Sequence, residues 1–193
     1  MQANYARILG LSQTSTGDLR GYNSSFFTPG KTLYYENLNL ELQKKLSDKV
    51  KVNAGYYYIV ANNSIVHVTE YEGTIFSHTG VLDVLWKLRP KRSLRMEAQS
   101  LFTRQDRGNW AMLLAEYSIA PHWFVAASNE LNYQNPNTDK PINYFFGTIG
   151  YLSGPFRVTL GFGRQRAGVF CVGGVCRTVP ASNGVSMSVS GSF

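Results

Sequence analysis

Two cysteines and three histidines are the residues of this chain best suited to redox, covalent or metal chemistry. Cys171 and Cys176 enclose the segment VGGV, whose Gly-Gly pair suits the two-residue turn of a β-hairpin. The two thiols would then face each other at a separation that a disulfide spans. We therefore predict a disulfide that closes the last long loop in an oxidising compartment, with a pair of reduced thiols as the alternative.

The same residues disfavour metal binding and catalysis. Zinc takes four ligands, and no histidine lies near Cys171 and Cys176 in the sequence. His122 falls in a tight turn and His78 on an expected apolar face, so only His67 lies in a loop suited to surface chemistry. No phosphate-binding loop, zinc-protease motif or nucleophile elbow occurs in the sequence. We expect no catalytic residue, no metal and no cofactor, and hence no enzyme.

The last ten residues predict a strand that separates an apolar environment from a polar one. One face carries Val185, Met187, Val189 and Phe193, while serines alternate with them on the other face. The strand ends on the aromatic Phe193. Closing strands of bacterial outer-membrane barrels often end in this way, because the last residue joins the aromatic girdle at the periplasmic rim.

Bulk composition predicts one all-β domain over residues 1–193. The chain has 12 Tyr, 11 Phe, 3 Trp and 18 Gly, which favours strands and turns over helices. No run approaches the roughly 20 apolar residues of a membrane helix. Ten segments fit strands, at about 2–12, 32–46, 49–61, 75–89, 92–104, 109–120, 122–134, 141–152, 155–166 and 181–193.

Strand length and turn length both favour a membrane barrel. Most segments reach the roughly 9–11 residues that a tilted membrane strand needs. Tight turns near Asp48, Pro90, Pro121 and Pro155 alternate with mostly longer connections. This alternation is typical of outer-membrane barrels, with tight turns at the periplasmic rim. Counted back from the C-terminus, it places the Cys171–Cys176 loop outside.

Alternation along the strands separates lumen positions from lipid positions, although Glu36, His78 and Asn129 fall on the apolar side and 141–152 favours neither face. Buried without partners, charged inner residues would each cost several kcal/mol, so an oily interior is excluded. The predicted lumen charges are Glu41, Lys45, Asp83, Lys87, Arg95, Glu97, Glu116, Glu130 and Arg157. The predicted membrane-girdle residues are Trp86, Trp110, Trp123, Tyr133, Phe156 and Phe193.

The net charge of +7 does not indicate a nucleic-acid partner, because no helix or RNA-binding motif organises the Lys and Arg residues. Basic clusters surround tight turns, where they are solvated or contact lipid head-group phosphates. The N-terminus has no signal-peptide pattern, so we expect a mature form or a part of an exported protein.

From residue 78 onward the chain resembles the C-terminal part of a family of large Bacteroidota outer-membrane β-barrel proteins of uncharacterised function. The resemblance rests on residues 78–129 and on 163–193, where paired cysteines, an arginine-rich strand end and a terminal Phe occur together. Residues 31–62 resemble the family only generally, and residues 1–30 hardly at all. The resemblance implies a transmembrane barrel without established catalytic residues. Members of the family are much longer than this chain.

Together these features predict an antiparallel up-and-down transmembrane β-barrel of about ten strands, complete or part of a larger barrel. The expected function is a non-enzymatic passive channel or membrane scaffold in the bacterial outer membrane. Its expected partners are outer-membrane lipid and, through the closing strand, the barrel-assembly machinery. One alternative is a filled barrel that binds a partner through loops 13–31, 62–74 and 167–180, since a ten-strand barrel is narrow. The other is a soluble ligand-binding barrel, whose apolar residues would face inward.

Overall fold

The computed structural model describes residues 1–10, 32–66 and 71–191. Ten strands form one sheet, and two further strands form a separate hairpin. The strands of the large sheet are β1 (Gln2–Leu9), β2 (Leu33–Lys45), β3 (Val50–Asn62), β4 (Thr74–Arg89), β5 (Arg92–Phe102), β6 (Asn109–Ile119), β7 (Trp123–Gln134), β8 (Ile142–Ser153), β9 (Phe156–Gln165) and β12 (Ser182–Ser190). The hairpin comprises β10 (Gly168–Val172) and β11 (Val175–Val179), and one short helix, α1 (Asn63–Val66), follows β3.

The large sheet is antiparallel throughout, in the order β1-β2-β3-β4-β5-β6-β7-β8-β9-β12. All ten predicted strands are confirmed, and each boundary differs from the prediction by only a few residues. The barrel closure expected from the sequence is not observed. In the described part of the chain, β1 pairs with β2 alone and β12 with β9 alone, so the sheet is open.

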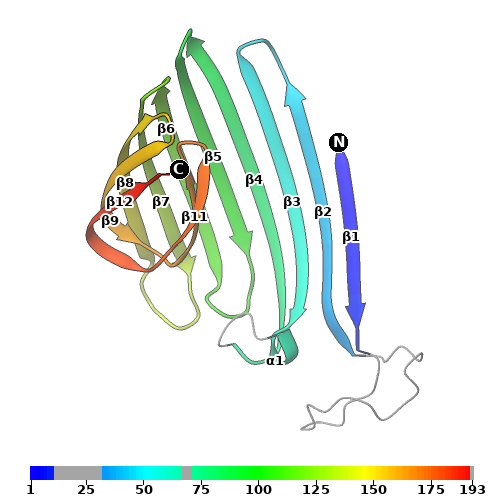
Figure 1. Cartoon of the computed structure of the whole chain (residues 1–193). Helices are drawn as coiled ribbons and strands as arrows, with labels where there is room; N and C mark the ends of the chain where they lie inside the picture. Colours follow the sequence, from blue (N-terminus) through cyan, green and yellow to red (C-terminus); the bar gives the residue numbers. More distant parts are fainter. Residues whose placement is uncertain (11–31, 67–70, 192–193) are drawn as a thin grey trace.

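The two rims of the sheet carry connections of different length. Figure 1 shows the N-terminus and the short turns β2–β3, β4–β5 and β6–β7 at the upper rim. The described parts of the longer connections, residues 63–66 with α1, 71–73, 103–108 and 135–141, lie at the lower rim (Figure 1). The predicted alternation of turn length is therefore confirmed where it can be followed. Residues 13–31, predicted to form a loop, lie outside the described residues.

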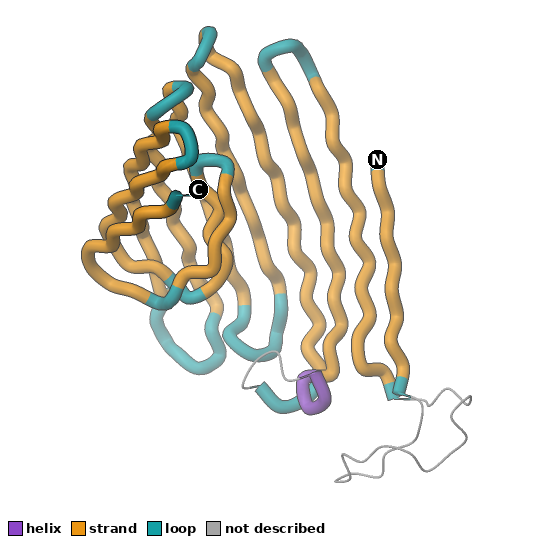
Figure 2. The backbone as a smooth tube through the Cα atoms, in the orientation of Figure 1, coloured by secondary structure: helices purple, strands orange, loops and turns teal. Residues whose placement is uncertain are grey.

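The sheet has two distinct faces, which cross-strand pairs trace from one strand to the next. Directly paired residues of neighbouring antiparallel strands project to the same side. Ser186 pairs with Gly161, Gly161 with Thr148, and Thr148 with Ala126. Ala126 then pairs with Glu116. We call the side of this row the concave face, because the sheet curves around the β10–β11 hairpin on that side (Figure 2).

The opposite, convex face is apolar and exposed. On β12, Val185, Met187 and Val189 are 80%, 67% and 61% exposed, while the serines between them face the concave side. The predicted alternation of this strand is confirmed. The exposed large apolar residues of the convex face are Tyr5, Leu42, Tyr56, Phe76, Leu82, Trp86, Met96, Phe102, Leu113, Ile119, Trp123, Val125, Tyr133, Phe145, Ile149, Tyr151, Phe156, Leu160, Phe162, Val185, Met187 and Val189.

Two polar residues that the sequence assigns to the apolar side do lie there, each with a polar partner. Glu36 accepts a hydrogen bond from the Tyr5 hydroxyl at 2.8 Å, and the Arg7 Nε lies 3.7 Å from its carboxylate. His78 Nδ1 lies 2.8 Å from the Tyr56 hydroxyl. Local pairing therefore accommodates these exceptions to the alternation.

The Cys171–Cys176 loop packs against the sheet and does not extend away from it. Segment 167–180 contains β10 and β11, which fold back over the concave face (Figure 2). This also explains why residues 141–152 favour neither face in the sequence. On β8, Phe146 is buried beneath the hairpin, whereas its neighbour Phe145 is exposed on the convex face. Within the described residues, no helix has the length and apolar character needed to cross a membrane.

Candidate functional site on the concave face

The β10–β11 hairpin has the geometry that its sequence predicts. Gly173 and Gly174 form its turn with φ values of 57° and 75°, in the left-handed region that a type I′ turn requires. Cys171 pairs with Cys176 in the register of the two strands and forms a disulfide with it. The predicted disulfide is confirmed, and it ties β10 to β11 beside the turn.

An apolar layer attaches the hairpin to β6, β7 and β8. Phe124 is the centre of this layer and is only 1% exposed. Gly150 lets the Phe124 ring approach the sheet, because a Cβ at position 150 would lie 2.1 Å from that ring. The rings of Phe146 and Phe170 meet edge to face at 5.7 Å. The buried members of the layer are Leu114, Phe124, Ala126, Phe146, Phe170, Val172 and Val179.

Arg157 of β9 holds the tip of the hairpin through the backbone. Its Nη1 donates to the Gly173 carbonyl at 2.9 Å, and its Nη2 donates to the Val172 carbonyl at 2.6 Å. The guanidinium carbon lies 4.9 Å from the centre of the Phe124 ring, a cation–π distance. One side chain therefore joins the polar and apolar parts of the contact.

Glu116 and Arg95 also hydrogen-bond the backbone of the hairpin tip. Glu116 Oε2 accepts from the Gly173 amide at 2.7 Å, and its Oε1 accepts from the Ser118 hydroxyl at 3.1 Å. Arg95, which pairs with Glu116 across the sheet, donates from Nη1 to the Cys171 carbonyl at 3.4 Å. Three predicted lumen charges from β5, β6 and β9 thus converge on four backbone groups of the hairpin.

A charge network extends from Arg95 toward β3. Its Nε donates to Asp83 Oδ2 at 2.6 Å, and its Nη2 donates to Glu97. Asp83 in turn accepts from Asn53 Nδ2 at 3.2 Å, and Glu97 accepts from Gln99. These carboxylates are largely removed from solvent, and their pairing with Arg95 offsets the cost of desolvating them.

The remaining predicted lumen charges lie apart from the hairpin tip. Glu130 pairs with Arg166 at 3.4 Å near the hairpin base. Glu41 accepts from the Tyr57 hydroxyl at 3.0 Å, and Lys45 pairs with Asp48 of the adjacent turn at 2.6 Å. Lys87 is exposed near the end of β4. The structure therefore brings together Asp83, Arg95, Glu97, Glu116 and Arg157 but not the other four.

The predicted girdle residues divide between the two faces. Trp86, Trp123, Phe156 and Tyr133 are exposed on the convex face. Trp110 lies instead on the concave face, where it is 8% exposed, so the girdle assignment of this residue is corrected. Trp110 shares the parity of Glu116 along an unbroken stretch of β6, so strand alternation places its indole on this face. There it stacks on Tyr144, and the Arg166 guanidinium covers it at 4.4 Å.

Several predicted positions carry no site or cannot be placed. His122 Nδ1 bonds the Leu152 carbonyl oxygen at 2.8 Å and belongs to a turn. The described ranges contain no cluster of three or more His, Cys, Asp or Glu residues able to hold a metal ion. His67 and Phe193 lie outside the described residues.

Sequence reasoning missed the residues that receive the hairpin. Leu114, Phe124 and Phe146 share the face of Glu116, Ser128 and Asn132, an otherwise polar face. Large apolar residues on the polar side of neighbouring strands indicate that something covers that side. This signal was present in the sequence, but the strand pattern alone does not identify the covering segment.

The fold and this site define an all-β protein whose curved antiparallel sheet carries a disulfide-bonded hairpin on its concave face. A family model matches residues 1–193, and the chain belongs to this family of unknown function, DUF6029. The match confirms the expectation of an uncharacterised family and extends over the whole chain. Comparison with curated proteins and with solved structures found no match.

Proposed function

We propose that the protein is a wall of an outer-membrane β-barrel, acting as a non-enzymatic membrane scaffold with a filled interior. The observation that carries this proposal is the continuous apolar convex face, with Met187 and Leu160 among its exposed residues. Soluble monomers rarely expose apolar patches larger than a few hundred Å². Lipid as the surrounding solvent accounts for this face and for the polar concave one.

The charged concave face favours the membrane over a soluble ligand-binding barrel. A soluble barrel turns its apolar side chains inward. Here the large residues Phe162 and Val185 face away from the concave side, and Arg95 and Glu116 face toward it. The arrangement is the one that a lipid exterior and a polar interior would stabilise.

The docked hairpin favours a filled interior over an open passive channel. It covers β6 to β9, and Phe170, Val172 and Val179 are buried against the wall. The passive channel is the second candidate, because a space of about 210 Å³ remains beside the hairpin, between Gln99, Glu130 and Arg166. In planar bilayers, a scaffold is expected to give no steady conductance steps from folded protein. Such steps would support the channel.

The proposal includes closure of the open sheet into a barrel. β1 and β12 run antiparallel to each other, so they can pair directly or through inserted strand pairs. The apolar face of β12 is the surface through which the barrel-assembly machinery would receive the chain.

A pair of neighbouring substitutions on β12 tests the proposal. We expect Met187→Lys to destabilise the folded, membrane-inserted state by about 2–4 kcal/mol, because it places a charge on the lipid face. Ser188→Lys is the matched control on the concave face and should have a much smaller effect. Heat-modifiable gel migration after refolding into lipid vesicles measures the folded fraction. Equal effects of the two changes, or wild-type protein that stays in solution without detergent, would contradict the proposal.

A further inference from the structure

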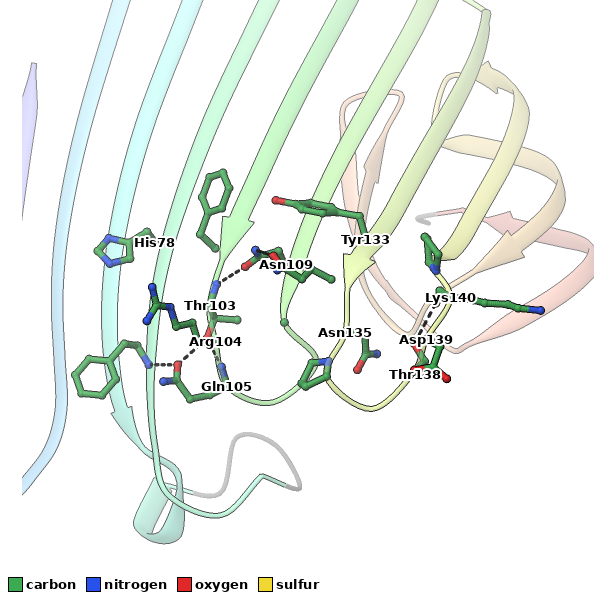
Figure 3. A pocket seen from close by; sticks show the side chains of 16 residues that line it. His78, Thr103, Arg104, Gln105, Asn109, Tyr133, Asn135, Thr138, Asp139 and Lys140 are labelled. Atoms are coloured by element: carbon green, nitrogen blue, oxygen red, sulfur yellow. Dashed lines mark hydrogen bonds between the residues drawn. The ribbon is translucent and has the colours of Figure 1, made fainter.

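A large open pocket lies at the lower rim of the sheet, where β4, β5, β6, β7 and β8 meet the loops 103–108 and 135–141 (Figure 3). Its volume is about 1100 Å³. In Figure 3, His78 and Tyr133 lie on the strand side, and Arg104, Asn135 and Lys140 on the loop side. The pocket therefore joins the convex face to the polar loops.

The strand side of the pocket is aromatic and belongs to the convex face. Phe76, Phe102 and Tyr133 line it, and all three side chains are exposed. Phe102 pairs across the sheet with His78, which places both on the convex side. An apolar group that lies along the convex face can therefore enter the pocket without crossing a polar barrier.

The amide oxygens of the pocket are occupied by hydrogen bonds within the rim. Gln105 Oε1 accepts from the Phe76 amide at 3.3 Å and from the Thr103 hydroxyl at 3.0 Å. Asn109 Oδ1 accepts from the Thr103 amide at 2.8 Å. Since a backbone amide can only donate, these contacts fix which amide atom is the oxygen.

The same reasoning extends to the two other amides. Asn135 Oδ1 accepts from the Asn137 amide at 2.9 Å. With its oxygen fixed, Asn109 must donate from Nδ2, and Gln134 Oε1 accepts from it at 2.6 Å. Gln105, Gln134 and Asn135 therefore keep their amide nitrogens free to donate to a ligand, while each of their oxygens already accepts at least one hydrogen bond.

The unoccupied polar groups of the pocket are predominantly donors. Within the described ranges, no hydrogen bond or ion pair engages the Arg104 and Lys140 side chains or the side-chain nitrogens of Gln105, Gln134 and Asn135. Asp139 is the one carboxylate among the lining residues, so the two cations leave a net charge of +1. A ligand that matches these groups is anionic and rich in oxygen acceptors.

We propose that this rim pocket binds the phosphate-bearing headgroup of an anionic lipid, with the acyl chains lying along the convex face. The donors of Arg104, Lys140 and Gln134 would hold the phosphate oxygens, while Phe102 and Tyr133 contact the glycerol and the first methylenes. This inference rests on the proposed membrane function. The pocket's continuity with the apolar face favours a lipid over a free anion.

Native mass spectrometry of the full chain, in micelles containing phosphatidylglycerol or phosphatidylcholine, tests the site. We expect wild-type protein to retain phosphatidylglycerol roughly tenfold better than phosphatidylcholine, because the net positive charge of the pocket attracts the anionic headgroup. Arg104→Ala/Lys140→Ala should abolish this preference. Gln134→Glu should weaken it, because the acceptor for Asn109 remains while the free donor becomes an anionic oxygen.

Matched controls carry the same charge changes at the opposite rim. Lys44→Ala/Lys49→Ala and Gln43→Glu should retain the wild-type preference. Unchanged preference in Arg104→Ala/Lys140→Ala, or an equal loss in Lys44→Ala/Lys49→Ala, would overturn the site. Complete displacement of the lipid by excess inorganic phosphate would overturn the lipid assignment in favour of a free anion. Protein that needs detergent but shows no preference contradicts this site alone, whereas protein that needs no detergent contradicts the proposed function.

Discussion

Replacing Phe124 with alanine is expected to lower the free energy of unfolding by about 3–5 kcal/mol. Phe124 is almost fully buried between the sheet and the hairpin tip. A Cβ on Gly173 would lie 2.6 Å from its ring, which shows how closely the turn approaches it. The substitution leaves a cavity under the turn and removes the surface on which Arg157 lies. Urea unfolding in detergent micelles measures the loss.

Proteolysis of the hairpin is a second way to measure the effect of Phe124→Ala. In Phe124→Ala, trypsin is expected to cleave after Arg177 of β11 faster than in wild-type protein, because the hairpin leaves the wall more often. Phe145→Ala removes the same side chain from the convex face, where Phe145 is 54% exposed, and should leave the hairpin docked. Equal cleavage of the two variants at Arg177 would show that Phe124 does not anchor the hairpin.

Glu116→Ala is expected to lower the free energy of unfolding by about 3 kcal/mol. Glu116 is 6% exposed and accepts from the Gly173 amide. Removal of the carboxylate leaves the Gly173 amide without its acceptor. Arg157, which bonds the Gly173 carbonyl, also loses the negative charge beside it. The polar contacts that remain at the hairpin tip are then the ones that Arg95 and Arg157 make with its carbonyl groups.

Glu41→Ala is the control for the loss of a carboxylate on the concave face. Glu41 is exposed and bonds the Tyr57 hydroxyl far from the hairpin, so its loss should cost less than about 1 kcal/mol. Urea midpoints in micelles and cleavage at Arg177 compare the two variants. A Glu116→Ala protein as stable as Glu41→Ala would refute the role given to the buried carboxylate.

The strands and their faces could be predicted from sequence because alternation is a local property. Ser186 and Met187 report opposite environments whatever lies beyond them, and both faces are confirmed. The turn at Gly173 and Gly174 was equally predictable, since both glycines adopt the positive φ that the turn demands. The Cys171–Cys176 disulfide followed from the register of that turn.

The direction of the hairpin could not be predicted in the same way. A hairpin can point away from a sheet or back over it, and contacts distant in sequence decide between the two. Here Glu116 meets Gly173 across 57 positions, and Arg95 meets Cys171 across 76. Pairing between β1 and β12 would also join residues distant in sequence, so the number of strands does not predict whether the sheet closes.

The hairpin leaves and rejoins the wall at one point, because Gln165 and Ser182 are direct partners in the β9–β12 ladder. Segment 166–181 is thus an insert between two strands that would pair without it. Changes in its length or sequence need not disturb the register of the wall, provided that they keep the residues that meet Phe124 and Glu116. The segment on the concave face can therefore diversify independently of the large sheet, much as a loop does at the surface of a soluble fold.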